Sequence, residues 1–334
     1  MTKPTFKALL VTKNDDNNYN RNIVEKTWDD LPEGDLLIRV NYSSLNYKDA
    51  LSATGHPGVT KKFPHVPGID AAGTVVASKV PQFPTDAKVI ITSCDLGVNT
   101  WGGFAEYIRV PAAWVIPLPD GMTLKESMIF GTAGFTAALC IDALEKNNIT
   151  PEDGEVLVTG ATGGVGSIAV AILAKLGYSV VAVTGKQSQH EYLKSLGAGL
   201  VISREEINDN SGKPLLKERW AGAVDTVGGN TLATMIKSSK YGGCVTACGL
   251  VGGADLITTV YPFILRGVKL IGIDSVKCPI ATRLEVWKKL AFDWKPLQLE
   301  EMATTVNLEQ LPDKIKAILK GEIVGRVLVQ HGLG

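Results

Sequence analysis

The sequence lacks a net charge and lacks a clustered basic stripe. Its 34 Lys and Arg residues are balanced by 34 Asp and Glu residues in a chain of 334, which is long enough for two domains. Without a positive field, nucleic acid is not an expected partner. A long apolar run is also missing, because the uncharged stretch over residues 127–141 is shorter than the ~20 residues that span a bilayer. We therefore expect a buried helix there and no membrane partner.

Cysteine and histidine are scarce. The five cysteines are scattered and none forms a C-x-x-C pair, which suits a reducing compartment such as the cytoplasm. Cys244 and Cys248 lie in an apolar run and are predicted to be small buried hydrophobes. Together with four histidines, the cysteines offer no recognisable zinc spacing, so we predict no metal. The apolar run at 8–11 is too short for a signal peptide, and export is not expected.

The stretch that organises the chain is 155–186. An apolar run at 156–159 is typical of a buried parallel strand, glycines and an amphipathic helix follow it, and a second strand is expected over 179–183. The segment Ala161-Thr162-Gly163-Gly164-Val165-Gly166 loosely matches G-x-G-x-x-G, with alanine at the first glycine. Glycine is needed because a pyrophosphate must approach the N–H groups that begin the helix. A dinucleotide site is therefore predicted; the alternative is a glycine turn without a ligand.

A carboxylate is missing from the end of the second predicted strand. NAD-binding units usually place Asp or Glu there to bind the ribose hydroxyl, whereas this chain has Thr184-Gly185-Lys186. A hydroxyl, a backbone N–H and an ammonium could together hold a 2′-phosphate. We therefore expect NADPH as the cofactor. In the alternative interpretation, Lys186 is simply a solvated surface lysine.

The first part of the chain shows short strand patterns broken by turn residues. A compact, barrel-like antiparallel domain is expected from them, with a short helical turn within 43–51. The strands are expected at 8–11, 36–42, 73–76, 88–92 and 104–110. A long helix is expected over 125–146.

The second part predicts an α/β fold with a doubly wound parallel sheet, because strand patterns alternate with helical ones. After the βαβ unit, strands are expected at 200–203, 223–226, 244–249 and 268–273. Ligands lie beyond the carboxyl ends of such strands, so we expect one crevice to be bordered by Thr184, Arg204, Leu250 and Ser275. A helix over 311–320 and a strand over 326–330 are expected to return to the first domain, which would place the active site in a cleft between the domains.

Eight sequence blocks together resemble the medium-chain dehydrogenase/reductases. More narrowly, they resemble the zinc-free acrylyl-CoA reductase group, which includes the YhdH/YhfP-type quinone oxidoreductases. The blocks are SSLNYKDAL (43–51), PHVPGIDAAGTV (64–75), FGTAGFTAALC (130–140), VTGATGGVGS (158–167), HEYLKSLGA (190–198), WAGAVDTVG (220–228), YGGCVTACGL (241–250) and PFILRGVKLIGIDSV (262–276). Zinc alcohol dehydrogenases carry a cysteine near the place of Asn46 and Gly-His-Glu near Asp70, and this chain has neither signature.

The resemblance implies a Rossmann domain at 129–295 and a GroES-like catalytic domain made of 1–128 and 296–334, in a homodimer. It implies reduction of acrylyl-CoA to propionyl-CoA, with hydride added at the β-carbon and a proton at the α-carbon. The NADPH contacts that it implies are Tyr47, Thr162, Gly163, Gly164, Val165, Thr184, Gly185, Lys186, Arg204, Leu250, Ile264 and Ser275, with a further position at Lys320.

Tyr47 is our candidate catalytic residue, because a phenol is a plausible proton donor. Asn46 and Asp49 would support it. The alternative is that Tyr47 is a packing aromatic whose hydroxyl lies in water. Two other functions stay open: an NADPH:quinone oxidoreductase, and a non-catalytic NADPH-binding protein.

Overall fold

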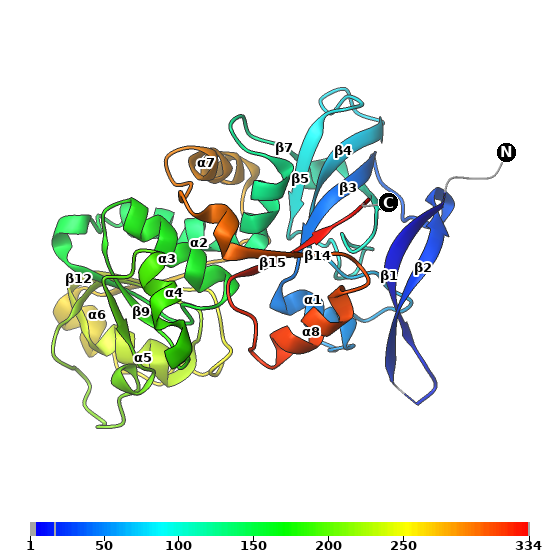
Figure 1. The fold of residues 1–334 in the computed structure, drawn as a ribbon. Helices are drawn as coiled ribbons and strands as arrows, with labels where there is room; N and C mark the ends of the chain where they lie inside the picture. The colour runs from blue at the N-terminus through cyan, green and yellow to red at the C-terminus, as the bar shows by residue number, and fades with distance from the viewer. Residues whose placement is uncertain (1–4, 17, 333–334) are drawn as a thin grey trace. The chain divides into compact units, whose positions relative to one another are not determined.

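The computed structural model describes residues 5–16 and 18–332. The chain divides into two compact units (Figure 1). Unit 1 comprises Met1–Thr132 and Leu299–Gly334, and unit 2 comprises Ala133–Gln298. Helix α2 (Leu124–Lys146) carries the chain from one to the other, and Gly131 interrupts its helical backbone with φ 51° and ψ −156°. By length and composition alone α2 could cross a membrane, and 89% of its most apolar window is buried in the structure.

Unit 1 is built on a mixed sheet. The order of its strands is β14 (Ala303–Val306), β15 (Arg326–Gln330), β3 (Leu36–Ser44), β4 (Asp70–Ser78), β5 (Lys88–Thr92) and β7 (Ile116–Pro117), and β6 (Tyr107–Val110) also pairs with β3. The pairings are antiparallel except that of β14 with β15, which is parallel. The expected antiparallel pairing therefore holds for every pair but one, and the C-terminal strand β15 returns to this unit and pairs directly with β3, as predicted.

A hairpin and two helices complete unit 1. Strands β1 (Thr5–Lys13) and β2 (Tyr19–Thr27) form a separate antiparallel pair. Helix α1 (Tyr47–Ala53) packs against α8 (Leu311–Leu319). From α8, the fully buried Leu311 and Ile315 enter the same apolar core as Ala50 and Ala53 of α1. This packing fixes the position of α1, which begins at Tyr47.

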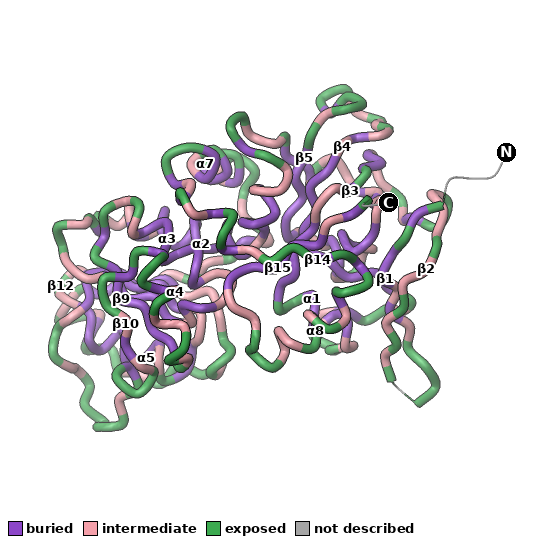
Figure 2. The backbone as a smooth tube through the Cα atoms, viewed as in Figure 1, coloured by how far each residue is buried: buried purple, intermediate pink, exposed green. Residues whose placement is uncertain are grey.

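Unit 2 contains a parallel six-stranded sheet. Its order is β10 (Leu200–Ile202), β9 (Ser179–Val183), β8 (Glu155–Val158), β11 (Trp220–Asp225), β12 (Ser239–Ala247) and β13 (Lys269–Gly272), and every neighbouring pair is parallel. This is the 3-2-1-4-5-6 order of the doubly wound dinucleotide-binding sheet. In Figure 2 the exposed residues of unit 2 lie mainly in the helices and loops around its buried strands.

The helices of unit 2 follow its strands. They are α3 (Gly164–Lys175), α4 (His190–Ser195), α5 (Gly229–Lys237), α6 (Tyr261–Arg266) and α7 (Ile280–Ala291). Short 3₁₀ turns occur in the two units at 28–30, 112–114, 151–153, 187–189, 205–207 and 299–302. The prediction that Cys244 and Cys248 are both buried is half right. Cys244 is buried within β12, whereas Cys248 follows the strand and is partly exposed. All five cysteines are free thiols.

Candidate active site

The turn between β8 and α3 requires glycine for its own geometry. A Cβ on Gly166 would lie 2.3 Å from the carbonyl oxygen of Gly160 and 2.8 Å from the Cα of Ala161. A Cβ on Gly163 would meet only that same oxygen, at 3.3 Å, and otherwise open space. The first turn of α3 also presents N–H groups that have no partner within the helix. The turn therefore leaves room for a pyrophosphate to approach the start of α3.

The ends of β9 and β10 bring a hydroxyl and two cationic residues together. The Thr184 hydroxyl accepts a hydrogen bond of 3.0 Å from the N–H of Lys186. Arg204, just beyond β10, lies against Gly185 so closely that a Cβ there would be 2.7 Å from the arginine Nε. The structure thus brings Arg204 against Gly185, which stands between Thr184 and Lys186 in the chain, and such a group suits a phosphate.

A cavity of about 360 Å³ opens at this edge of the sheet. It lies at the ends of β8, β9 and β11, which include the point where the strand order reverses and ligands usually bind. Its lining includes Gly160, Val183, Arg204, Val227 and Val251.

Of the four residues expected to border one crevice, Arg204 lines this cavity. Leu250 is 67% exposed, and Ser275 is buried with its carbonyl accepting a 2.7 Å hydrogen bond from Arg283. The four residues follow four different parallel strands and therefore share one edge of the sheet.

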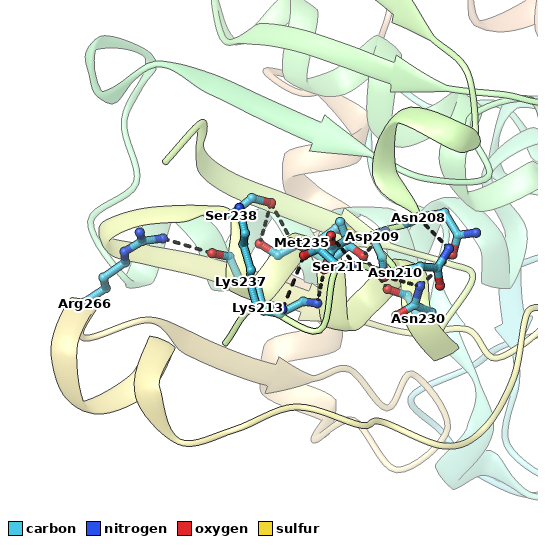
Figure 3. A network of polar contacts seen from close by, with 11 residues as sticks. Asn208, Asp209, Asn210, Ser211, Lys213, Asn230, Met235, Lys237, Ser238 and Arg266 are labelled. Atoms are coloured by element: carbon cyan, nitrogen blue, oxygen red, sulfur yellow. Dashed lines mark hydrogen bonds and ion pairs between the residues drawn. The ribbon is translucent and has the colours of Figure 1, made fainter. Parts of the chain in front are cut away.

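A polar network anchors one rim of the cavity. Asn208 lines the cavity, and Asn230 donates to its side-chain oxygen at 2.7 Å and to the Asp209 carbonyl at 2.9 Å (Figure 3). Lys237, which is 8% exposed, contacts the Asp209 carboxylate at 2.5 Å and lowers its pKa to about 2. The pKa of Asp209 is therefore lower in the folded protein than in an unfolded chain, so its pairing with Lys237 stabilises the rim above about pH 4. This stabilisation is lost as the pH falls toward 2.

In unit 1, a buried carboxylate gathers polar groups from three segments. The Asp70 carboxylate, fully buried at the start of β4, accepts hydrogen bonds from the Ser44 hydroxyl at 2.6 Å and the Asn46 amide at 2.7 Å. Thr132 donates to it twice, through its N–H at 2.9 Å and its hydroxyl at 2.6 Å. Four donors therefore hold this carboxylate in one orientation.

Arg326 on β15 places a cation beside this carboxylate. It is 3% exposed, and its guanidinium donates to the Ser44 hydroxyl at 2.9 Å and to the carbonyl of Ile129 at 2.9 Å. It also lies 3.3 Å from the side-chain oxygen of Asn46. A Cβ on Gly131 would be 2.5 Å from both the Asp70 carboxylate and the Ser44 hydroxyl, so the positive φ of Gly131 and its missing side chain let α2 approach the cluster.

A second buried carboxylate, that of Asp49, fixes the start of α1. It accepts hydrogen bonds from the N–H of Asn46 at 2.7 Å and from the N–H of Ile69 at 2.8 Å, and with Asn46 it forms a capping box. Burial, followed by the charge of Asp70, raises the pKa of Asp49 to about 7. Tyr47, the first residue of α1, is 45% exposed, and its hydroxyl has no hydrogen bond within the described residues.

Four members of this cluster were missed by the sequence reasoning, namely Ser44, Asp70, Thr132 and Arg326. Three of them are polar side chains in or beside apolar strands, within SSLN, GIDAAG and GRVLVQ, and a polar residue buried in a strand indicates a partner. Within residues 5–16 and 18–332, no group of three or more His, Cys, Asp and Glu side chains is arranged to hold a metal ion.

The two folds and the glycine turn define a class of protein, the medium-chain dehydrogenase/reductases. A model of the alcohol dehydrogenase GroES-like domain matches residues 32–120, and a model of the zinc-binding dehydrogenase matches residues 164–292.

Relatives match the whole chain. YhfP of Bacillus subtilis, which bears the name of a quinone oxidoreductase, is 50% identical over 97% of this chain and 98% of its own length. Its crystal structure with NAD bound has a TM-score of 0.96 at 49% identity, covering 98% of this chain and all of that one.

The acrylyl-CoA reductase AcuI of Ruegeria pomeroyi is 47% identical over 97% of this chain and 98% of its own length. The YhdH oxidoreductase of Salmonella enterica, solved with NADP, has a TM-score of 0.95 at 48% identity, covering 98% of this chain and all of that one. The protein therefore belongs to the acrylyl-CoA reductase (YhdH/YhfP-type) family of oxidoreductases within this class.

Proposed function

We propose that the protein uses NADPH to reduce the carbon–carbon double bond of acrylyl-CoA, giving propionyl-CoA. The observation that carries this proposal is the similarity to the acrylyl-CoA reductase AcuI along essentially the whole of both chains. The cofactor choice is supported by Lys186 at the end of β9, where an NAD-binding unit would place a carboxylate, and by Arg204, which follows β10 and lies against Gly185.

The residues of unit 2 fit the proposed cofactor. Thr162, Gly163, Gly164 and Val165 would bind its pyrophosphate at the start of α3, and Thr184 to Lys186 with Arg204 would bind its 2′-phosphate. The remaining proposed contacts are Leu250, Ile264 and Ser275 of unit 2, with Tyr47 of unit 1. When bound, the reduced nicotinamide supplies a hydride. The preference for NADPH rests on Lys186 as a point charge and on Arg204 as a planar fork.

Replacing Gly166 by alanine tests the glycine turn. We expect the free energy of unfolding to fall by about 1–3 kcal/mol, because the new Cβ would overlap three backbone atoms. We also expect the Kd for NADPH to rise about tenfold, because the displaced turn no longer directs its N–H groups at the phosphates. Gly199→Ala is the control, since its Cβ would approach nothing closer than 3.7 Å. Equal effects of the two variants on NADPH binding would contradict this interpretation of the turn.

The chain's own groups must meet the negative charge that forms on the thioester oxygen. Asn46 has little capacity left for this, because its amide donates to Asp70 at 2.7 Å and lies 3.2 Å from the Asp49 carboxylate. Tyr47 is different, since its half-exposed hydroxyl has no partner among the described residues. We therefore assign Tyr47 as the donor to the substrate, and Asn46 and Asp49 as the residues that hold it in place.

A steady-state screen tests the proposed reaction. NADPH consumption is measured with acrylyl-CoA, longer enoyl-CoA thioesters and a benzoquinone, and we expect the highest kcat/KM with acrylyl-CoA. The second candidate is an NADPH:quinone oxidoreductase, which the name of YhfP favours. A higher kcat/KM for the quinone would select that function. Binding of NADPH without turnover of any acceptor would instead indicate a non-catalytic NADPH-binding protein.

We also propose that the protein is a cytoplasmic homodimer. Strand β13 pairs only with β12 among the described strands, so it leaves one edge of the sheet open. This unit also has exposed apolar residues at Val260, which is 64% exposed, and at Leu265, which is 56% exposed. Sedimentation equilibrium should give twice the mass of the 35.6 kDa chain, and a monomer at micromolar concentration would refute the dimer. The proposed cytoplasmic location is supported by the five free cysteines, because a reducing compartment keeps thiols reduced.

A further inference from the structure

One segment of unit 1 exposes charge of a single sign. Between Leu45 and Ile69 the charged residues are Lys48, Asp49, Lys61 and Lys62. All three lysines are exposed, whereas Asp49 is fully buried. The chain as a whole has no net charge, but the exposed charged residues of this segment are all lysines.

Hydrogen bonds hold this segment against α1. The loop after α1 turns back onto it, because the N–H of His56 donates to the carbonyl of Leu51 at 2.9 Å. The hydroxyls of Ser52 and Thr60 are 2.7 Å apart, and these residues are 0% and 2% exposed. Because Ser52 lies one helical turn beyond Lys48, this contact brings the chain at residues 61–62 back beside the helix that begins with Tyr47.

The loop is also anchored on its other side. The Thr60 hydroxyl donates to the carbonyl of Val98 at 2.9 Å, and the Ser52 hydroxyl donates to the carbonyl of Gly97 at 3.2 Å. Thr60 directly precedes Lys61, so the backbone that carries the two adjacent lysines is fixed by buried polar contacts. The lysine backbone is thus positioned in advance, which lowers the entropy cost of binding a ligand.

The three lysines have no acidic partner within the described residues. Two other lysines of unit 1 do have one: the exposed Lys7 pairs with Glu309 at 3.0 Å, and the partly exposed Lys125 pairs with Glu300 at 2.5 Å. On the neighbouring helix α8, the exposed Asp313 is itself paired with Lys316. The positive charge of Lys48, Lys61 and Lys62 is therefore not neutralised by an ion pair within unit 1.

We propose that Lys48, Lys61 and Lys62 bind the phosphate groups of the coenzyme A moiety of the substrate. The proposal rests on the proposed function. An acyl-CoA carries a pyrophosphate and a 3′-phosphate, which are joined to the thioester by the flexible pantetheine arm. Lysine binds phosphate as a point charge. A quinone has no comparable group, so this surface distinguishes the CoA thioester from the alternative acceptor.

The test compares two substrates that share one reacting group. Acrylyl-CoA carries the phosphates, and acrylyl-pantetheine lacks them. In the double variant Lys61→Glu/Lys62→Glu, the KM for acrylyl-CoA should rise at least about tenfold, because two attractive charges become repulsive. The kcat/KM for acrylyl-pantetheine should change by less than about twofold, since this substrate carries no phosphate to interact with the lysines of the original protein or with the glutamates of the variant. Calorimetry with CoA alone should show a parallel increase in Kd.

The matched control is Lys79→Glu/Lys88→Glu, which makes the same change of net charge with two exposed lysines of unit 1 at the ends of the β4–β5 hairpin. It should leave the KM for acrylyl-CoA within about twofold of the original value. The proposal is overturned if both double variants act alike, or if Lys61→Glu/Lys62→Glu impairs both thioesters equally. If the unaltered protein neither binds CoA nor reduces acrylyl-CoA, the proposed function itself fails.

Discussion

Replacement of Arg326 by methionine should lower the free energy of unfolding by about 3–5 kcal/mol, the cost of leaving buried carboxylates without the cation near them. Arg326 is the cation that lies among Asp70, Asn46 and Ser44, and it is 3% exposed. Methionine retains the length of the side chain but offers no donor and no charge. Asp49 and Asp70 then remain buried without a counter-charge. Urea unfolding at pH 8 measures the effect.

The loss in free energy of unfolding caused by Arg326→Met should depend on pH. Burial and Asp70 raise the pKa of Asp49 to about 7, well above that of an unfolded Asp. Asp49 therefore stays protonated in the folded protein up to about pH 7. Above that pH its carboxylate is ionised, and the positive charge of Arg326 then stabilises it most. The deficit should thus be largest at pH 8 and smaller at pH 5. An equal deficit at both values would show that lost packing, and not charge, is the cause.

Arg39→Met is the control for this experiment. Arg39 lies on β3 of the same unit and is exposed, so its replacement should change the free energy of unfolding by less than about 0.5 kcal/mol. A deficit as large as that of Arg326→Met would contradict the assignment of a special role to the buried guanidinium.

Tyr47→Phe should lower kcat for acrylyl-CoA about 100-fold, the usual cost of removing one donor to a developing oxyanion. The variant keeps the aromatic ring at the start of α1 and removes only the hydroxyl. Because that hydroxyl has no partner among the described residues, its loss should leave the free energy of unfolding within about 0.5 kcal/mol of the original. Rates of NADPH oxidation and urea unfolding measure the two quantities separately.

Tyr241→Phe provides the comparison for the tyrosine experiment. Tyr241 lies on β12 of unit 2 and is 79% exposed, so removal of its hydroxyl should leave kcat unchanged within error. If Tyr47→Phe also retained full turnover, Tyr47 would be a packing residue. The search for the donor would then move to the other polar groups beside α1.

The parts of the fold that could be predicted from the sequence are those with a local signal. Strand β8, the glycine turn, α3 and β9 follow one another within about 30 residues, and each has its own periodicity or glycine. Strand β2 has no such signal, because most of its residues are polar and none is buried. Helix α7 was also missed, although its Trp287 is fully buried and stacks 6.0 Å from Phe135.

The candidate site was predicted in the same uneven way. Asn46 and Asp49 are three residues apart, so a capping box is readable from the sequence. Arg326 meets Asn46 across 280 positions, and no local pattern indicates such a contact. Strand-end reasoning placed Arg204 at the correct edge beside Gly185. That Leu250 and Ser275 border the same crevice stays a prediction, because a shared sheet edge does not specify which side chains meet.

The discontinuity of unit 1 has a consequence for synthesis on the ribosome. Unit 2 is a single run of chain, so all its strands are available soon after residue 298 is translated. Unit 1 must wait longer, because β15 pairs with Tyr42, Ser43 and Ser44 of β3 and also supplies Arg326. Until that strand emerges, the nascent protein holds an open edge on β3 and an uncompensated Asp70. The first residues translated thus belong to the last unit completed.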